Sequence, residues 1–356
     1  MSNPFVSVIM SVYGVEDYIE SGIKSIRAQS SSDWELIIVD DKTPDDSIVI
    51  ARKYEEIDKR IKIYHHETNK GLSAARNTGI KHATGKYLWF MDPDDTVDDD
   101  LIEEVEESVK INPAKVVLFG LNEEYYKEDG EFVYDHHIVP IEENFNNKLA
   151  LRPCVMELEK QTLFGYAWNK FYDREYILER GIKFETVYLI EDILFNIRVF
   201  RELDSLNLLG IAPYHYAKRG TGSLTNKFVP EYYALHRKRI SELNKMLSYW
   251  NLETDENKEL LGGLFARYIL SALQRNCDKR SEMDRKQRKE FIYKVFIDKL
   301  YKKLIPYAKA KESTSLRIWI AILKSGKAMP CLAFGRIVNI IRNGSPMIYN
   351  MTKSER

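Results

Sequence analysis

The stretch "WELIIVDDKTPDDS", residues 34–47, sets a short apolar run directly before two adjacent carboxylates and a turn. An apolar run of this length predicts a strand that is buried on both faces. "KTPDDS" then supplies turn residues and a helix cap, so a helix is predicted from there to about Ile57. A buried strand followed by a helix is the repeating unit of a parallel sheet that is covered by helices.

The same unit recurs on both sides of this stretch. Strands are predicted at Phe5–Val12, 60–66 and 86–91, and helices at 15–29 and Leu72–His82. The first of these helices carries apolar residues at helical spacing: Tyr18, Ile19, Gly22, Ile23 and Ile26. The sequence therefore predicts a parallel sheet with helices on both faces, in which ligands bind beyond the C-terminal ends of the strands.

The rest of the chain is predicted in less detail. A helix is expected at 101–110, a fifth strand at 115–121, and a passage from strand to helix at Glu191 and Asp192. Residues 122–165 are polar and predict a long loop region or small hairpins. Beyond Pro230 the pattern is helical only. We expect three parts: residues 1–110, 111–228 and a helical, basic 229–356.

Composition and charge limit the partners and the compartment of the protein. The formal net charge of −1 over 356 residues argues against a nucleic-acid partner. Three widely spaced cysteines, Cys154, Cys277 and Cys331, favour a reducing compartment, so we expect a cytoplasmic location. The C-terminal segment differs from the whole chain in net charge, because residues 279–356 contain 19 Lys and Arg residues but only 6 Asp and Glu residues.

Three carboxylates follow the fourth predicted strand in "YLWFMDPDDT", residues 87–96. They are Asp92, Asp94 and Asp95. Acids at a helix N-terminus can simply complement the helix dipole, which explains Asp98–Asp100. Asp92 and Asp94 precede the helix, however, and a D-x-D pair is suited to Mg²⁺ or Mn²⁺ that bridges phosphates. Ser11, Tyr13 and Asp41 end neighbouring strands, so all these groups are expected on one rim.

Several blocks together resemble family 2 glycosyltransferases, which are inverting, metal-dependent enzymes of GT-A fold. The blocks occur in the family's order over about residues 4–226: "FVSVIMSVYGVEDYI", "WELIIVDDKTPDDS", "NKGLSAARNTGIKHATGKYLWFMDPDD", "AWNKFYDREYI", "EDILFNIRVF" and "HYAKRGTGSLT". The resemblance implies a Rossmann-like, mostly parallel α/β sheet with an all-α C-terminal extension.

The resemblance also implies roles for single residues. Tyr13 would stack on uracil beside Ser11, and Asp41 would accept the uracil N3–H, which makes the donor a UDP-sugar. Asp92 would face the ribose, with Asp95 supporting the site. Asp94 would bind Mn²⁺ or Mg²⁺, with His215 as a further metal or phosphate ligand. The remaining implied contacts to the donor come from Arg76, Arg219 and Ser223.

Asp192 is the implied catalytic base, with Glu191 as its neighbour. Inverting transfer needs a carboxylate that takes the proton of the acceptor hydroxyl on the face opposite the leaving group. Two features depart from the family pattern: Gly14 stands where the family has Asn, and Lys42 and Thr43 reshape the loop after Asp41. The donor sugar, the acceptor and the linkage position are not encoded in any motif.

Two other functions stay open at this stage. "DPDDT" also satisfies the D-x-D-x-T motif of haloacid-dehalogenase-like phosphatases, with Asp92 as nucleophile, Asp94 as acid/base and Lys170 as the later lysine. That motif normally ends the first strand, whereas here three strand-helix units precede it. The third alternative is a non-catalytic scaffold that binds a sugar nucleotide.

The basic tail predicts a further partner. Residues 316–341 mix Ile, Trp and Phe with Lys and Arg, a composition typical of helices at an anionic membrane surface. Peripheral association with the inner face of the cell membrane would suit an acceptor that is a glycan, a lipid-linked molecule or an anionic polymer. Assembly into a homo-oligomer through the same helices is equally open.

Overall fold

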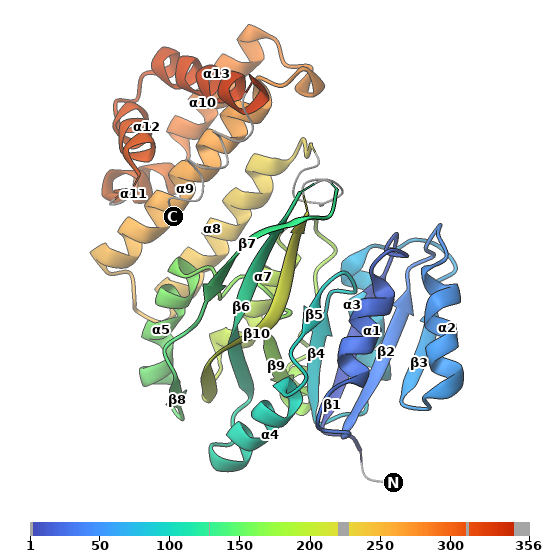
Figure 1. The fold of residues 1–356 in the computed structure, drawn as a ribbon. Coiled ribbons are helices and arrows are strands. Elements are labelled where there is room, and N and C mark those ends of the chain that lie inside the picture. The colour runs from blue at the N-terminus through green and yellow to red at the C-terminus, as the bar shows by residue number, and fades with distance from the viewer. Residues whose placement is uncertain (1–2, 128, 220–227, 311–312, 345–356) are drawn as a thin grey trace. The chain divides into compact units, whose positions relative to one another are not determined.

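The computed structural model describes residues 3–127, 129–219, 228–310 and 313–344, with side chains to residue 341. The chain divides into two compact units, residues 1–226 (unit 1) and 227–356 (unit 2). Unit 1 is a mixed α/β domain, whereas the described elements of unit 2 are helical (Figure 1). The predicted fold class, a sheet flanked by helices with a helical C-terminal extension, is confirmed.

The first part of unit 1 contains the predicted alternation of strands and helices. Its elements are β1 (Val6–Val12), α1 (Ile19–Arg27), β2 (Trp34–Asp40), α2 (Ser47–Ile57), β3 (Ile61–His65), α3 (Leu72–His82) and β4 (Tyr87–Met91). β1 pairs in parallel with both β2 and β4, and β2 pairs in parallel with β3 (Figure 1). Because parallel neighbours end on the same edge, the residues that follow β1, β2 and β4 lie along one rim.

The second part of unit 1 extends the same sheet. Its elements are β5 (Thr96–Val97), α4 (Leu101–Ile111), β6 (Val116–Tyr126), β7 (Phe132–Ile138), β8 (Glu143–Phe145), α5 (Lys148–Lys160), β9 (Lys170–Asp173), α6 (Arg174–Glu179), α7 (Glu191–Arg201) and β10 (Leu206–Arg219). The strand order is β3-β2-β1-β4-β9-β6-β10-β5, with β7 beside β6 and β8 beside β10. β9 runs antiparallel to β4 and β6, so the sheet is mixed.

Apolar packing explains the first strands and helices. Every residue of β2 is buried, which agrees with its short apolar run. α1 buries Ile19, Gly22, Ile23 and Ile26, so the predicted face of this helix is confirmed. α3 approaches β1 closely, because a Cβ at Gly79 would lie 2.3 Å from Cγ2 of Ile9.

Two expectations for unit 1 are wrong. Residues 187–190 do not form a strand before Glu191: Leu189 has φ of 67°, which is not strand backbone, and only Ile190 of the four is buried. Residues 122–165 are more regular than predicted. They contain the expected hairpin of β6 and β7, but also α5, whose pattern is obscured by Pro153 inside the helix.

Unit 2 contains helices along all of its described length. They are α8 (Tyr232–Tyr249), α9 (Asp255–Asn276), the 3-10 turn η2 (Lys279–Ser281), α10 (Arg285–Ile297), α11 (Lys299–Leu304), the 3-10 turn η3 (Ile305–Tyr307), α12 (Thr314–Lys324) and α13 (Ala328–Gly344). α8 and α9 each bury an apolar side, which includes Ile240 and Leu243 in α8 and Phe265 and Ile269 in α9. Within the described residues, no helix has both the length and the apolar character needed to cross a membrane.

Candidate active site

The predicted rim begins with two residues at the end of β1. The Ser11 hydroxyl is buried and has no hydrogen-bond partner among the described residues. Tyr13 is 52% exposed, although it is a large aromatic residue. A buried hydroxyl without a partner is costly unless a ligand completes it. These two residues therefore fit a ligand that brings a polar edge and a flat ring to this end of the sheet.

Asp41 ties the end of β2 to the start of α3. Its carboxylate accepts the backbone N–H groups of Lys70 (2.8 Å) and Gly71 (2.7 Å), and it contacts Nδ1 of His66 at 2.7 Å. An ionised carboxylate has about four acceptor positions, so one remains for a ligand. Asp41 thus has a structural role in addition to its predicted contact to uracil.

The two departures from the family pattern form one contact. Gly14 has φ of 70° and Lys42 has φ of 60°, so both loops turn through left-handed backbone. The Thr43 hydroxyl accepts the N–H of Gly14 at 2.8 Å and donates to Asp45 at 2.6 Å. Glycine suits this backbone because it has no Cβ. Thr43, in the loop after Asp41, therefore holds the loop after β1 in place through its hydrogen bond with Gly14.

Asp95, one of the three acids after β4, is bound within the protein. It is 2% exposed, accepts the Tyr214 hydroxyl at 2.9 Å and accepts the N–H of Ala217 at 3.0 Å. Burial, with the nearby charges of Asp94 and Asp92, raises the pKa of Asp95 well above its usual range. Asp95 thus joins the acidic turn to β10, and its supporting role in the site stays a prediction.

Arg76 connects Asp92 with Asp192, which lies 100 residues further along the chain. The guanidinium is 2% exposed, donates to Oδ1 of Asp92 at 3.1 Å and also donates to Oδ1 of Asp192. It lies 5.1 Å from the ring centroid of Phe184. Burial lowers the pKa of Arg76, but the two carboxylates outweigh this effect and leave it above its usual value. A buried cation therefore joins the acidic turn to the predicted base.

Asp192 is held from its other side by the segment before β9. Its Oδ2 accepts the N–H of Ala167 at 3.0 Å. That segment is in turn held by buried polar groups: Lys170 donates to the carbonyls of Leu163 (2.8 Å) and Tyr166 (2.6 Å) and to Oδ1 of Asn169 (2.7 Å). Since an ammonium has three N–H donors, these three contacts engage all the donors of Lys170. This contradicts the free lysine that the phosphatase alternative requires.

Asp94 is the most exposed of the three acids, with 45% of its side chain accessible. Arg219 donates to its backbone carbonyl at 3.0 Å and lies 3.9 Å from its Oδ2. The same guanidinium lies 4.0 Å from the ring centroid of Tyr18, so it is oriented by stacking. Arg219 thus lies beside the acidic turn, and its contact to the donor stays a prediction.

The acidic cluster fits a divalent cation that has further ligands of its own. Burial, together with Asp94 and Asp192, raises the pKa of Asp92 to about 6 against the opposing effect of Arg76, and burial also raises the pKa of Asp94. No group of three His, Cys, Asp or Glu side chains is arranged to hold a metal in the described part of the chain. Mg²⁺ and Mn²⁺ are often bound by one or two carboxylates plus substrate phosphates. Asp92 and Asp94 provide that number.

His215 contacts two carboxylates, and its role as a metal or phosphate ligand stays a prediction. Nδ1 faces Glu124 at 2.7 Å and Nε2 faces Asp98 at 2.9 Å, so both ring nitrogens already have carboxylate partners. On β10 the neighbouring Tyr214 contacts Asp95, whereas His215 contacts Asp98 instead. The other late residue, Ser223, lies outside the described residues.

Sequence reasoning missed a group of aromatic residues near the acids. Trp168 stacks on Tyr214 with centroids 4.2 Å apart and on Tyr166 at 4.4 Å. Tyr216 lies 5.3 Å from Trp168, and burial, with Tyr166 and the three acids, raises its pKa above its usual range. The signal was present in "YAWNK" and "YHYAK", but strand alternation in β10 became evident only from its pairing.

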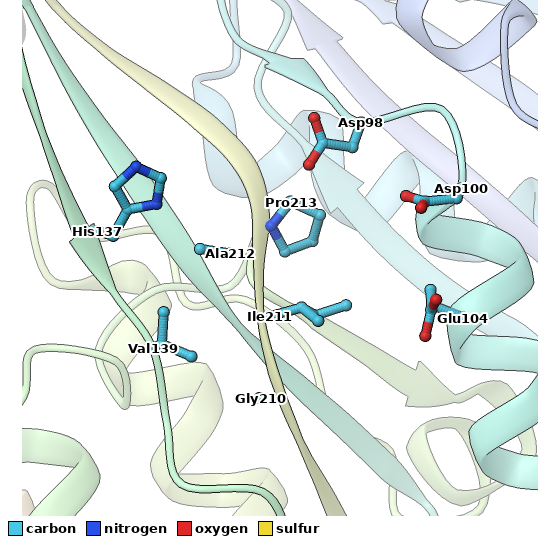
Figure 2. Close-up of a pocket in the computed structure, with 9 residues that line it drawn as sticks. All are labelled: Asp98, Asp100, Glu104, His137, Val139, Gly210, Ile211, Ala212 and Pro213. Atoms are coloured by element: carbon cyan, nitrogen blue, oxygen red, sulfur yellow. The ribbon is translucent and has the colours of Figure 1, made fainter.

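A separate pocket in unit 1 lies between α4, β7 and the bulge of β10. Its volume is about 320 Å³, and Figure 2 shows its lining: Asp98, Asp100, Glu104, His137, Val139, Gly210, Ile211, Ala212 and Pro213. None of the predicted site residues lines it. This pocket is therefore distinct from the rim that carries Asp92 and Asp192.

We expect Gly22→Ala to destabilise unit 1. A Cβ at Gly22 would lie 2.9 Å from the carbonyl oxygen of Pro93 and 3.3 Å from that of Asp95, within the acidic turn. Alanine normally stabilises a helix interior by about 1 kcal/mol. Here the clash should lower the free energy of unfolding by about 1–3 kcal/mol, measured by urea denaturation. Ser21→Ala, at an exposed position of the same helix, is the control. A Gly22→Ala protein more stable than wild type would contradict this contact.

Glu191 should make stability depend on pH. Burial, with the neighbouring charge of Asp192, raises its pKa from 4.5 to about 7, and its Oε2 has no partner among the described residues. The folded protein therefore binds a proton that the unfolded chain has lost, and stability falls as pH rises from about 5 to 8. Glu191→Gln should remove about 2 kcal/mol of that fall, as measured by urea unfolding of metal-free protein. Glu179→Gln, at an exposed position in α6, is the control and should show the same pH dependence of stability as wild type. If the stability of Glu191→Gln changed with pH as steeply as that of wild type, the raised pKa of Glu191 would be rejected.

The comparison with protein families adds to this geometry. The model that matches is "Glycosyl transferase family 2", over residues 7–181. Residues 7–181 are a glycosyl transferase family 2 domain. The match includes Ser11, Asp41, Arg76 and the three acids after β4, and it ends before Glu191 and Asp192 in α7.

Relatives of this family 2 domain include named bacterial proteins. The chain is 36% identical to "Uncharacterized glycosyltransferase EpsJ" of Bacillus subtilis (strain 168) over 226 residues, which is 62% of this chain and 63% of that protein. It is 43% identical over 100 residues to "Putative teichuronic acid biosynthesis glycosyltransferase TuaG" of the same organism, covering 28% and 40% of the two chains. The alignments thus span less than two thirds of these relatives.

The fold of this protein is also found in a solved structure. The crystal structure of S. aureus TarS 1-349 in complex with UDP-GlcNAc superposes with a TM-score of 0.66 and 19% identity. It covers 97% of this chain and 92% of that one. At this identity the likeness establishes the shared fold, including the GT-A sheet.

Proposed function

We propose that this family 2 protein is an inverting glycosyltransferase that moves a sugar from a UDP-sugar to a hydroxyl of a cell-envelope glycan or polymer. The observation that carries the proposal is the Arg76 bridge, which brings Asp92 and Asp192 to one buried guanidinium. Sugar transfer requires that the donor and the acceptor are held next to each other. Asp92, proposed to contact the donor, and Asp192, proposed to activate the acceptor, are held together by Arg76.

In the proposed reaction the acceptor hydroxyl oxygen attacks the anomeric carbon as the bond to the UDP oxygen breaks. Asp192 takes the hydroxyl proton, and the configuration at the anomeric carbon inverts. Arg76 and the N–H of Ala167 hold the two carboxylate oxygens of Asp192 in place. A divalent cation at Asp94 and Asp92 would supply neutralisation of the charge on the departing diphosphate.

The donor proposal rests on the rim. Tyr13 offers an exposed ring for stacking, Ser11 a buried hydroxyl without a partner in the described structure, and Asp41 one further acceptor position for uracil N3–H. Since TarS was solved with UDP-GlcNAc, that donor is the first to test. The name of TuaG supports an anionic envelope polymer as acceptor class. We propose that the reaction takes place in the cytoplasm.

Asp94→Asn should weaken UDP-GlcNAc binding in Mn²⁺ by at least about tenfold, because one metal ligand is lost. Isothermal titration with UDP and UDP-GlcNAc, with and without Mn²⁺, measures this. Asp99→Asn removes an exposed acid from the turn between β5 and α4 and should bind like wild type. Mn²⁺-dependent binding unchanged in Asp94→Asn would reject the metal site. Selective donor binding by wild type without hydrolysis or transfer would favour the scaffold alternative.

A further inference from the structure

Helix α13 in unit 2 is firmly packed on one side. A Cβ at Gly335 would lie 2.9 Å from Cβ of Leu273 in α9, so the two helices touch closely. Gln274 of α9 donates to Oδ1 of Asn339 at 3.1 Å, and Trp319 of α12 stacks on Phe334 at 5.6 Å. The orientation of α13 about its own axis is therefore set by its neighbours.

The opposite side of α13 is exposed and apolar. Met329 is 52% exposed, Ile337 53%, Ile340 61% and Ile341 41%. Together with exposed Ala333, these positions share one side of a helix with 3.6 residues per turn. Single exposed apolar residues are ordinary, but an apolar stripe along one helix marks an interaction surface. We call this stripe the α13 face.

The charged side chains of the segment that carries the α13 face are of one sign. Residues 313–344 contain five Lys and Arg residues and no Asp or Glu. Lys324 at the end of α12 and Lys327 in the turn before α13 are exposed, and Arg336 is exposed beside the stripe. An apolar helix face with cations along its border matches an anionic lipid surface, where alkyl groups enter the boundary and cations contact headgroups.

A second copy of the chain fits this surface less well. A two-fold contact would place the α13 face against itself, because such interfaces use the same patch on both subunits. The cations would then meet without any acid from this segment, and like charges across an interface oppose association. Charge complementarity thus selects lipid over self-association.

We propose that the α13 face docks this protein on an anionic membrane surface. The isoleucines enter the headgroup boundary, and Lys324, Lys327 and Arg336 contact anionic headgroups. This inference rests on unit 2 and is independent of the transfer reaction.

Sedimentation of the full chain with vesicles tests the apolar part of the proposal. Wild type should bind phosphatidylglycerol-containing vesicles and bind pure phosphatidylcholine much more weakly. Ile337→Gln with Ile340→Gln should reduce binding by roughly tenfold. The matched control is Ile57→Gln with Ile111→Gln in unit 1, where the side chains are 68% and 77% exposed. The control should bind like wild type, and unchanged melting temperatures confirm folding.

A second pair of variants tests the charges. Lys324→Gln with Lys327→Gln should weaken binding by more than about tenfold at low salt, whereas Lys59→Gln with Lys81→Gln removes the same charge from unit 1 and should not. No binding of wild type to anionic vesicles, equal binding to both lipids, or equal loss in both lysine pairs would overturn the proposal. So would light scattering that shows a wild-type dimer converted to monomer by the double isoleucine variant.

Discussion

Asp192→Asn is expected to lower kcat for sugar transfer by about 10³-fold while donor affinity stays within about twofold of wild type. Asparagine has nearly the same shape, and its oxygen can still accept the N–H of Ala167, but it cannot take a proton from the acceptor. Transfer is measured with UDP-GlcNAc as the first donor, and donor affinity by titration calorimetry.

The control for this variant is Asp204→Asn. Asp204 is also an ion-paired aspartate of unit 1, since it contacts Nζ of Lys115 at 2.7 Å. It should retain nearly full transfer. If Asp192→Asn kept more than a tenth of the wild-type kcat, Asp192 would not be the base. Glu191→Gln would then show whether the neighbouring carboxylate takes the proton.

Arg76→Ala is expected to cost about 3–5 kcal/mol of folding free energy at pH 7.5. The change leaves Asp92 and Asp192 buried without their shared cation, beside Glu191. The deficit should shrink as pH falls from 7.5 toward about 6, because the unpaired carboxylates of the variant then bind protons in the folded state while wild type does not yet do so. The pKa of Asp92, already about 6 with Arg76 present, should rise further. Urea unfolding at several pH values measures both effects.

Two further variants make this result specific. Arg76→Lys keeps the charge but lacks the planar fork, so it should recover only part of the loss. Arg198→Ala removes an Arg that pairs with Glu185 and is 45% exposed, and it should cost no more than about 1 kcal/mol. If Arg76→Ala and Arg198→Ala lowered the free energy of unfolding equally, the buried Arg76 bridge would contribute no more than an exposed ion pair.

The N-terminal half of the sheet was predictable because its signals are local. The buried run of β2, the helical stripe of α1 and the bounds of α3 each depend on residues within one or two turns or strands. The rim followed from parallel neighbours ending together. By contrast, the false strand at 187–190 and the missed helix α5 lie where apolar spacing is short or broken by proline.

The different contacts and exposures of Asp92, Asp94 and Asp95 were not predictable from the neighbouring residues in the sequence. Asp95 is bound by Tyr214 and Ala217 of β10, and Asp92 is paired with Arg76 of α3. Asp94 is left as the most exposed of the three acids. Their partners lie from 16 to 122 positions away in the chain. The contacts of His215 have the same origin, since strand register places this residue beside Asp98.

By itself the sequence determined the alternation of buried strands and helices, the acids at their ends and the basic, acid-free segment around α13, because these are properties of short stretches. Only the tertiary structure decided which carboxylate is buried, which is paired and which is open. Solvation and pairing of a charge depend on groups brought together across the fold, and desolvation in such a site costs more than any local preference supplies.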